Sequence, residues 1–474
     1  MNFEAVIGLE IHVEMKTKSK MFSNAPVTYG EIPNSQTVPL DLGFPGTMPV
    51  VNKQAVINAI RISHALHMSI DHELWFDRKN YFYSDLPKGY QITQQRRPIG
   101  SNGTLEIETS RGKKTISIER LHMEEDTCKQ LHSWDCTLLD YNRAGIPLVE
   151  IVSRPDLRSG EEAMKYAEKI RSIVSFLDVS NGKMEEGSLR CDVNVSIRPF
   201  GSEKLGTKVE IKNLNSFANI EKAIDFEVKR QEQILLSGGS VTQETRRFDE
   251  GLKQTVLMRL KTDAVDYKYF TEPNITPIKL SDEFINNAIE TSPELAESKL
   301  NRYEQLGLNE YDSNMLIANK EISCYFDEAI KTGANAKLLA NWLIVDVQSI
   351  LNKELISITD FPILPINLGK LVLMIEKGDI SNKQARDIFD KMYQTKEDPE
   401  TIKKSIGISL INNEEEILNL VNEIINANPQ AIVDYQNGKD RAVGFLVGQI
   451  MKKTQGKVNP ALANKYVVEE LRRR

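Results

Sequence analysis

The chain has 474 residues, a length that predicts about three domains of roughly 150 residues each. Hydrophobic residues make up 40% of it, which excludes disordered and fibrous classes, and the net charge of −7 argues against a protein coated in nucleic acid. The sequence contains no run of about 18 apolar residues, no signal-peptide pattern and only four scattered cysteines. We therefore expect a soluble, cytoplasmic protein.

Up to about residue 280 the sequence has the period-two alternation of β-strands. Apolar and polar residues alternate clearly over 6–13, 115–118 and 191–197. Helical patterns interrupt the strands at Lys53–Met68, Gly160–Leu177 and Asn219–Leu236. This mixture predicts an α+β protein whose N-terminal domain, residues 1–292, is built on a largely antiparallel sheet.

After residue 293 helical spacing predominates. Ser292-Pro293-Glu294 predicts a helix with proline at its first position, and Ser381 with Gln384 predicts a capping box. We predict an all-α helical domain over 293–409 and a small α-helical tail domain over 410–474.

The tail differs from the rest of the chain in charge. Between residues 437 and 474, nine basic and three acidic side chains give a local charge of +6. Lys452, Lys453 and Lys457 cluster between two turn signals. A solvated helical face and a phosphate-binding surface both fit this pattern, and charge alone does not decide between them.

Common nucleotide and zinc motifs are weak or absent. The sequence has neither G-x-x-x-x-G-K-[ST] nor G-x-G-x-x-G, and the glycine spacing of 182–188 lacks the lysine of a P-loop. Cys128, His132 and Cys136 have a spacing that suggests zinc. The residues around them have the pattern of strands and a turn, on which a tetrahedral site is difficult to build.

Acidic residues recur on the predicted strands where a charge is costly to bury. Glu125 alternates with apolar residues, and Glu150 stands inside an apolar run. A carboxylate in such a place must be paired or must hold a cation. Polar strand faces add Glu10, His12 and Asp192. Several acids with one histidine favour a hard divalent cation such as Mg²⁺, although ion pairs with nearby arginines fit as well.

A loop over 76–91 combines lysine, arginine, amide and aromatic side chains, among them Lys79. Such a mixture suits contacts with phosphate and purine groups. Exposed basic loops are common, so this loop alone does not identify a function.

Long motifs run through the whole chain in a fixed order: Ile7–Val13, Asp77–Tyr81, Leu86–Gln91, Glu124–Asp126, Asp140–Leu148, Glu186–Asn194, Glu210–Ser216 and Gly444–Lys452. On these motifs the chain resembles, from end to end, the B-subunit family of the bacterial aspartyl/glutamyl-tRNA(Asn/Gln) amidotransferases. The resemblance implies that the sheet domain is the cradle-shaped kinase and transamidase domain of that family.

The same resemblance implies a reaction and its partners. The family phosphorylates the side-chain carboxylate of Glu-tRNA(Gln), and often of Asp-tRNA(Asn), with ATP, and ammonia then displaces the phosphate. ATP and Mg²⁺ are the implied cofactors. The A subunit, a glutaminase, supplies the ammonia, and with a small C subunit the three chains form a heterotrimer. A pure RNA-binding module and a self-sufficient ligase that uses free ammonia are the alternatives; the acidic set argues against the former.

Site residues follow from the resemblance in three groups. Mg²⁺ is assigned to His12, Glu125 and Glu150, with Glu10 and Asp192 as further or water-mediated ligands. Contacts with phosphate or substrate are assigned to Lys79, Ser188 and Arg190. Binding of the tRNA body is assigned to the tail, with Lys452, Lys453 and Lys457 as candidates.

One departure from the family concerns zinc. Many relatives carry a four-cysteine zinc knuckle early in the chain. This sequence has Ser23, Ala25, Val38 and Asp41 at those positions, so no zinc is expected there.

Overall fold

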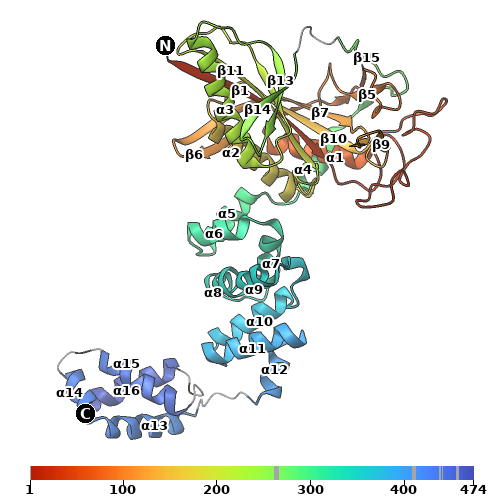
Figure 1. The fold of residues 1–474 in the computed structure, drawn as a ribbon. Helices are drawn as coiled ribbons and strands as arrows, with labels where there is room; N and C mark the ends of the chain where they lie inside the picture. The colour runs from red at the N-terminus through yellow and green to blue at the C-terminus, as the bar shows by residue number, and fades with distance from the viewer. Residues whose placement is uncertain are drawn as a thin grey trace. The chain divides into compact units, whose positions relative to one another are not determined.

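A computed structural model describes residues 2–260, 266–407, 413–436, 439, 441–454, 458 and 460–474. The chain divides into two compact units, Met1–Leu295 and Ala296–Arg474 (Figure 1). The predicted boundary after residue 292 lies close to this division, and the one after residue 409 falls outside the described residues, so both remain predictions. None of the described helices has the length and apolarity needed to cross a membrane.

The first unit is built on one large sheet and three small ones. The large sheet has the strand order β14-β13-β12-β11-β1-β10-β7-β6-β2. Among the described residues its neighbouring strands pair antiparallel, except β12 with β13, which are parallel. Its strands are β1 (Phe3–Glu14), β2 (Ser69–Ile70), β6 (Gly100–Thr109), β7 (Gly112–Glu125), β10 (Pro147–Ser153), β11 (Leu189–Pro199), β12 (Val209–Lys212), β13 (Glu244–Asp249) and β14 (Gln254–Leu260).

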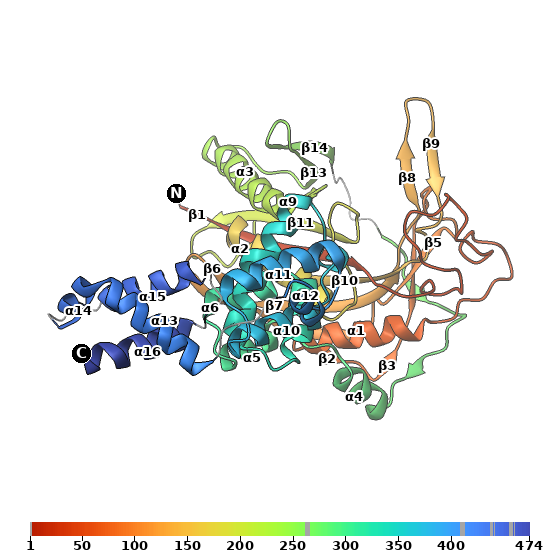
Figure 2. The same ribbon diagram turned by 90° about the horizontal axis from the view of Figure 1, so that it is seen from below.

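The small sheets consist of two or three short strands each. They pair β15-β4-β5, β16-β3 and β8-β9, and the β8–β9 hairpin projects clearly in Figure 2. Their strands are β3 (Glu73–Leu74), β4 (Asp77–Asn80), β5 (Tyr90–Thr93), β8 (Lys129–His132), β9 (Thr137–Asp140), β15 (Phe270–Thr271) and β16 (Ile278–Lys279).

Helices cover the apolar face of the large sheet. The unit contains α1 (Lys53–Ala65), α2 (Gly160–Phe176), α3 (Phe217–Leu236) and α4 (Asp282–Glu290). The apolar residues Leu9, Ile11 and Val13 of β1 are buried in one core with α1, α2 and α3, which leaves the alternate, polar residues of β1 on the other face. Gly160 lets α2 approach α3, since an added Cβ would lie 2.7 Å from the carbonyl oxygen of Glu221.

The second unit is helical and contains two separate cores. One core is formed by α5 (Ala296–Gln305), α6 (Glu310–Ile317), α7 (Lys320–Ile330), α8 (Ala336–Asn341), the π-helix Trp342–Val347, α9 (Gln348–Glu354), the short helix Ile358–Asp360, α10 (Pro365–Glu376), α11 (Asn382–Thr395) and α12 (Pro399–Ser405). The other is formed by α13 (Glu414–Ala427), α14 (Pro429–Gln436), α15 (Arg441–Lys453) and α16 (Pro460–Arg473). A sheet unit followed by a helical unit confirms the predicted α+β class.

Candidate functional site

Strand pairing brings charged residues from four strands into one row on the polar face of the large sheet. His12 of β1 pairs with Glu150 of β10, and Glu150 pairs with His122 of β7. On its other side His12 pairs with Arg190 of β11. Directly paired residues point to the same face of a sheet, so these four side chains lie side by side. They line a cleft of about 680 Å³.

His12, Glu124 and Glu150 form a compact group in this cleft, and their possible ligand atoms all lie within 4.8 Å of one another. Nε2 of His12 lies 3.5 Å from Oε2 of Glu150 and 3.7 Å from Oε1 of Glu124. Nε2 of His122 lies 3.2 Å from the same Oε2 of Glu150. Two carboxylates and an imidazole at this separation can hold a divalent cation.

The charges of this group compensate one another. Burial alone lowers the pKa of His12, but the hydrogen bond to Glu150 and the charges of Glu150 and Glu124 raise it above its ordinary value. Burial raises the pKa of Glu150, but the positive charges and hydrogen bonds of His122 and His12 hold it well below its usual range. Carboxylates buried this deeply are stable only beside positive charge.

The unpaired atoms of the group also fit a metal ion. Oε2 of Glu124 is buried and has no hydrogen-bond partner among the residues that the structure describes. A buried oxygen without a partner is costly, and a cation would satisfy it. Carboxylates with a single imidazole suit Mg²⁺ or Mn²⁺ better than they suit zinc, which prefers thiolate and several imidazoles in its structural sites.

Glu10, Asp192 and Glu210 form a second acidic group on neighbouring strands. Lys212 compensates it, because its Nζ is hydrogen-bonded to Asp192 and lies 3.3 Å from Oε1 of Glu210. Burial, followed by the charges of Glu150 and Asp192, raises the pKa of Glu10. The two residues predicted as further metal ligands, Glu10 and Asp192, thus lie in this lysine-paired group rather than in the group around His12.

Two of the predicted phosphate-binding residues line the cleft. Nζ of Lys79 lies 5.0 Å from the ring centre of Tyr267, and the charge of Glu124 raises the pKa of Lys79 although burial opposes it. Arg190 donates a hydrogen bond of 2.5 Å to Oδ2 of Asp126. The structure therefore brings Lys79 and Arg190 to the same cleft as the metal-binding group.

The structure places Glu125, a predicted metal ligand, outside the group around His12. Successive residues of a strand point to opposite faces, so Glu124 faces the cleft and Glu125 faces away from it. The Glu125 carboxylate forms an ion pair with Lys88 and accepts a hydrogen bond of 3.0 Å from the backbone N–H of Ile92. It is committed to these partners, and Glu124 stands beside His12 in its place.

The structure places Ser188, a predicted phosphate or substrate contact, in a local network of hydrogen bonds. Its Oγ accepts a hydrogen bond of 3.0 Å from the backbone N–H of Lys183 and contacts the side chain of Asn181. These contacts stabilise the loop before β11, and Ser188 is not among the residues that line the cleft.

A hydrogen-bonded carboxylate stands at one of the four positions where the sequence analysis expects no zinc. Asp41 accepts from Oγ of Ser23 at 2.8 Å, from the backbone N–H of Val38 at 3.1 Å and from Nζ of Lys20 at 3.2 Å. Lys20 is completely buried in this pair. These contacts connect residues 20–23 with residues 38–41. The expectation that no zinc binds there remains a prediction.

The other stretch considered for zinc lies at the β8–β9 hairpin. Cys128 is buried and Cys136 is exposed. Nδ1 of His132 lies 3.0 Å from Oγ1 of Thr137, its cross-strand partner. The histidine thus has a hydrogen-bond partner within the hairpin.

The predicted tail lysines are only partly described. Lys452 and Lys453 lie in the last turn of α15, and both are exposed. Lys453 forms an ion pair with Glu423 of α13. Lys457 lies outside the described residues.

Sequence reasoning assigned no role to several residues of the cleft, among them His122, Glu124 and Glu210. A signal for the first two exists in the sequence, because His122 and Glu124 occupy the polar half of the alternation whose apolar half contains Leu121, Met123 and Glu125. Glu210 carries no comparable signal, since it lies on a strand of four residues.

Comparison with known proteins identifies the family of the chain. The profile of the GatB/GatE catalytic domain matches residues 5–286, and that of the GatB domain matches residues 324–471. The aspartyl/glutamyl-tRNA(Asn/Gln) amidotransferase B subunits of Geobacillus thermodenitrificans and Bacillus cereus strain AH187 are both 50% identical to this chain, over the full length of each protein. The chain therefore belongs to the GatB family, the B subunits of the aspartyl/glutamyl-tRNA(Asn/Gln) amidotransferases.

Proposed function

We propose that this chain is the subunit that activates and amidates the side-chain carboxylate of Glu-tRNA(Gln), and of Asp-tRNA(Asn), in a heterotrimer with the glutaminase (A) and C subunits of the family. The names of its relatives support a tRNA-linked amidotransferase. The observation that carries the proposal is the group of His12, Glu124 and Glu150 beside Lys79 and Arg190 in one cleft.

The chemistry requires activation of a poor acceptor. A carboxylate repels nucleophiles, and oxide is a bad leaving group. ATP would transfer its γ-phosphoryl group to a carboxylate oxygen, which releases ADP and leaves an acyl phosphate. Ammonia from the glutaminase would then attack the carbonyl carbon, lose a proton and expel inorganic phosphate, which leaves the amide.

The residues of the cleft suit the first of these steps. His12, Glu124 and Glu150 would hold Mg²⁺, which when bound supplies positive charge to the phosphoryl oxygens. Lys79 and Arg190 add fixed positive charge at the same place, where the transferring group needs stabilisation. The aromatic rings of Tyr81 and Tyr267 lie beside Lys79, with their centres 5.7 Å and 5.0 Å from its Nζ.

Glu124→Gln tests the proposal in the assembled complex. We expect the affinity of the variant for Mn²⁺, measured by calorimetry, to fall at least tenfold, because a charged ligand becomes neutral. Amidation and tRNA-dependent ATP hydrolysis should fall below detection, while glutamine hydrolysis continues. Glu108→Gln, the same change at an exposed position of β6, is the matched control.

Wild-type Mn²⁺ affinity and amidation in Glu124→Gln would contradict the assignment. A wild-type complex that binds tRNA but shows no tRNA-dependent ATP hydrolysis would instead favour the RNA-binding module.

A further inference from the structure

A pair of cations stands at the corner of the cleft where β12 begins and β14 ends. Lys208 and Arg259 both line the cleft, both are exposed, and Gln243 lies with them. Their side chains have no hydrogen-bond or ion-pair partner within the described ranges, whereas Arg190 and Lys212 are paired with acids. Unpaired cations that face a cleft are suited to receive an anion.

The strand registers separate this corner from the metal-binding group. Asn194 pairs with Glu210, Glu210 with Thr245 and Thr245 with Arg259. Arg259 therefore lies on the same row as Glu210, four strands away from β1. At about 4.8 Å between neighbouring strands, four steps correspond to about 19 Å. A triphosphate is much shorter than this, so one phosphoryl group cannot contact both His12 and Arg259.

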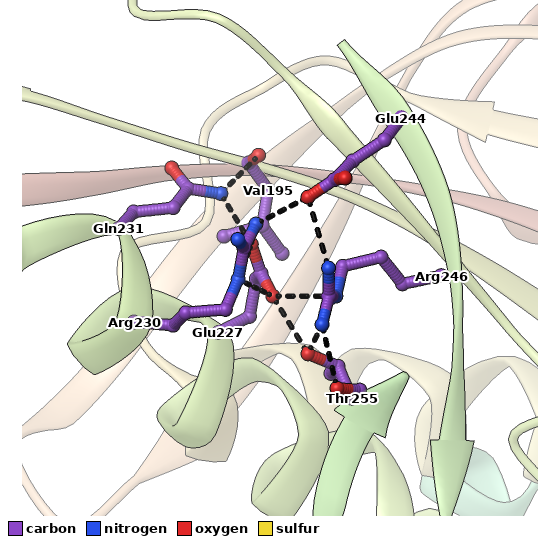
Figure 3. Close-up of polar contacts among 7 residues, drawn as sticks. All are labelled: Val195, Glu227, Arg230, Gln231, Glu244, Arg246 and Thr255. Atoms are coloured by element: carbon purple, nitrogen blue, oxygen red, sulfur yellow. Dashed lines mark hydrogen bonds and ion pairs between the residues drawn. The ribbon is translucent and has the colours of Figure 1, made fainter. Parts of the chain in front are cut away.

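A buried ring of charges fixes the strands that carry the corner (Figure 3). Arg230 of α3 donates to Glu227 and to Glu244, each at 2.7 Å, and Arg246 of β13 donates to Glu244 at 3.0 Å. Oγ1 of Thr255 on β14 donates to Glu227 at 2.9 Å. Glu227 is completely buried. The edge strand β14 is thus held by α3 as well as by its partner β13.

We propose that Lys208 and Arg259 bind a phosphodiester group of the tRNA acceptor strand, close to its aminoacyl end. The inference rests on the proposed function, which places the aminoacyl carboxylate at the metal-binding group and so draws the last nucleotides across the cleft. Arginine presents a planar fork of donors to phosphate, and lysine adds a flexible point charge. Contacts of this kind position an RNA without reading its sequence.

The double variant Lys208→Gln/Arg259→Gln in the assembled complex tests the inference, with deacylated tRNA(Gln) as the probe. We expect tRNA binding to weaken about tenfold and the slope of log Kd against log salt concentration to flatten by about one to two. The KM for ATP should stay within twofold of the wild-type value. Lys204→Gln/Lys253→Gln, at two exposed lysines outside the cleft, is the matched control and should bind tRNA as the wild type does.

Unchanged tRNA affinity and salt slope in the double variant would overturn the inference. A rise in the KM for ATP with normal tRNA binding would also overturn it, because the pair would then serve the phosphates of the nucleotide. Failure of the proposed function has a different signature, the loss of tRNA-dependent ATP hydrolysis in the wild-type complex.

Discussion

At the scale of single residues, Glu124 and Glu125 show how two identical neighbours acquire different roles. Glu124 has a buried oxygen without a hydrogen-bond partner in the described part of the chain, and it faces His12. Glu125 lies on the opposite face and is paired with Lys88, whose side chain is only 10% exposed. Glu124 therefore faces the cleft between two histidines, with an oxygen that no described residue hydrogen-bonds, whereas Glu125 is held by Lys88.

Glu125→Gln should affect stability rather than metal binding. The change leaves Lys88 with a buried and unpaired charge, which lowers the free energy of unfolding by about 3 kcal/mol. Urea unfolding of the purified chain measures this, and Mn²⁺ calorimetry should give an affinity within about twofold of the wild type. A variant that loses Mn²⁺ binding but keeps its stability would show that Glu125 is a metal ligand after all.

Alternation in the sequence predicted the face of Glu125 but not the role of this residue. It placed Glu125 among apolar residues correctly, and the cost of a buried carboxylate then suggested a metal. Lys88 comes from a loop whose path the sequence does not reveal, so the ion pair could not be predicted. The contacts of Ser188 could not be predicted for the same reason, since its partners Asn181 and Lys183 lie in a turn of its own loop.

At the scale of elements, periodicity was a good guide to helices and a poor one to strand order. The predicted helix Gly160–Leu177 is α2 (Gly160–Phe176), and the capping box at Ser381 is confirmed. The predicted helix start at Pro293 is wrong, because α5 begins at Ala296. The backbone N–H of Ser292 instead bonds to the carbonyl of Ile289 and ends α4.

The sheet contains one pairing that no local pattern specifies. β12 and β13 run parallel, which requires a long crossover, and α3 provides it. The crossover carries Glu227 and Arg230 to the strands they hold.

Glu227→Ala tests the importance of this ring for the edge of the sheet. Removal of its fully buried carboxylate leaves two partly buried guanidinium groups short of a partner, and we expect the free energy of unfolding to fall by about 3 kcal/mol. Amide hydrogen exchange should increase most in β13 and β14. Glu232→Ala, at a partly exposed position of the same helix, is the control; equal exchange in the two variants would show that the ring does not hold these strands.

At the scale of the whole molecule, the sheet unit and the two groups of helices each have a hydrophobic core of their own. Among the described residues, the core of α13 to α16 shares no buried residue with the core of α5 to α12 or with that of the sheet unit. A substitution in the tail should therefore leave the cleft intact.

Lys452→Gln should weaken tRNA binding of the assembled complex about twofold to fivefold and flatten the salt slope by about one, if this exposed lysine contacts a phosphate of the tRNA body. Mn²⁺ binding should not change. Lys353→Gln, at an exposed lysine of α9 in the other helical core, controls for the loss of one charge. Identical salt slopes for the two variants would mean that the basic tail is only a solvated surface.

The central place of β1 has a consequence for synthesis of the chain. β1 lies in the middle of the large sheet, between β10 and β11, and its residue His12 pairs with Glu150 and Arg190. A ribosome that adds about 5–20 residues per second needs roughly 10–40 s to make the chain from His12 to Arg190. During this time the two sheet neighbours of β1 are still being completed. The strand that forms the centre of the folded unit is thus the first to be synthesised, and the strands on both sides of it follow much later in the chain.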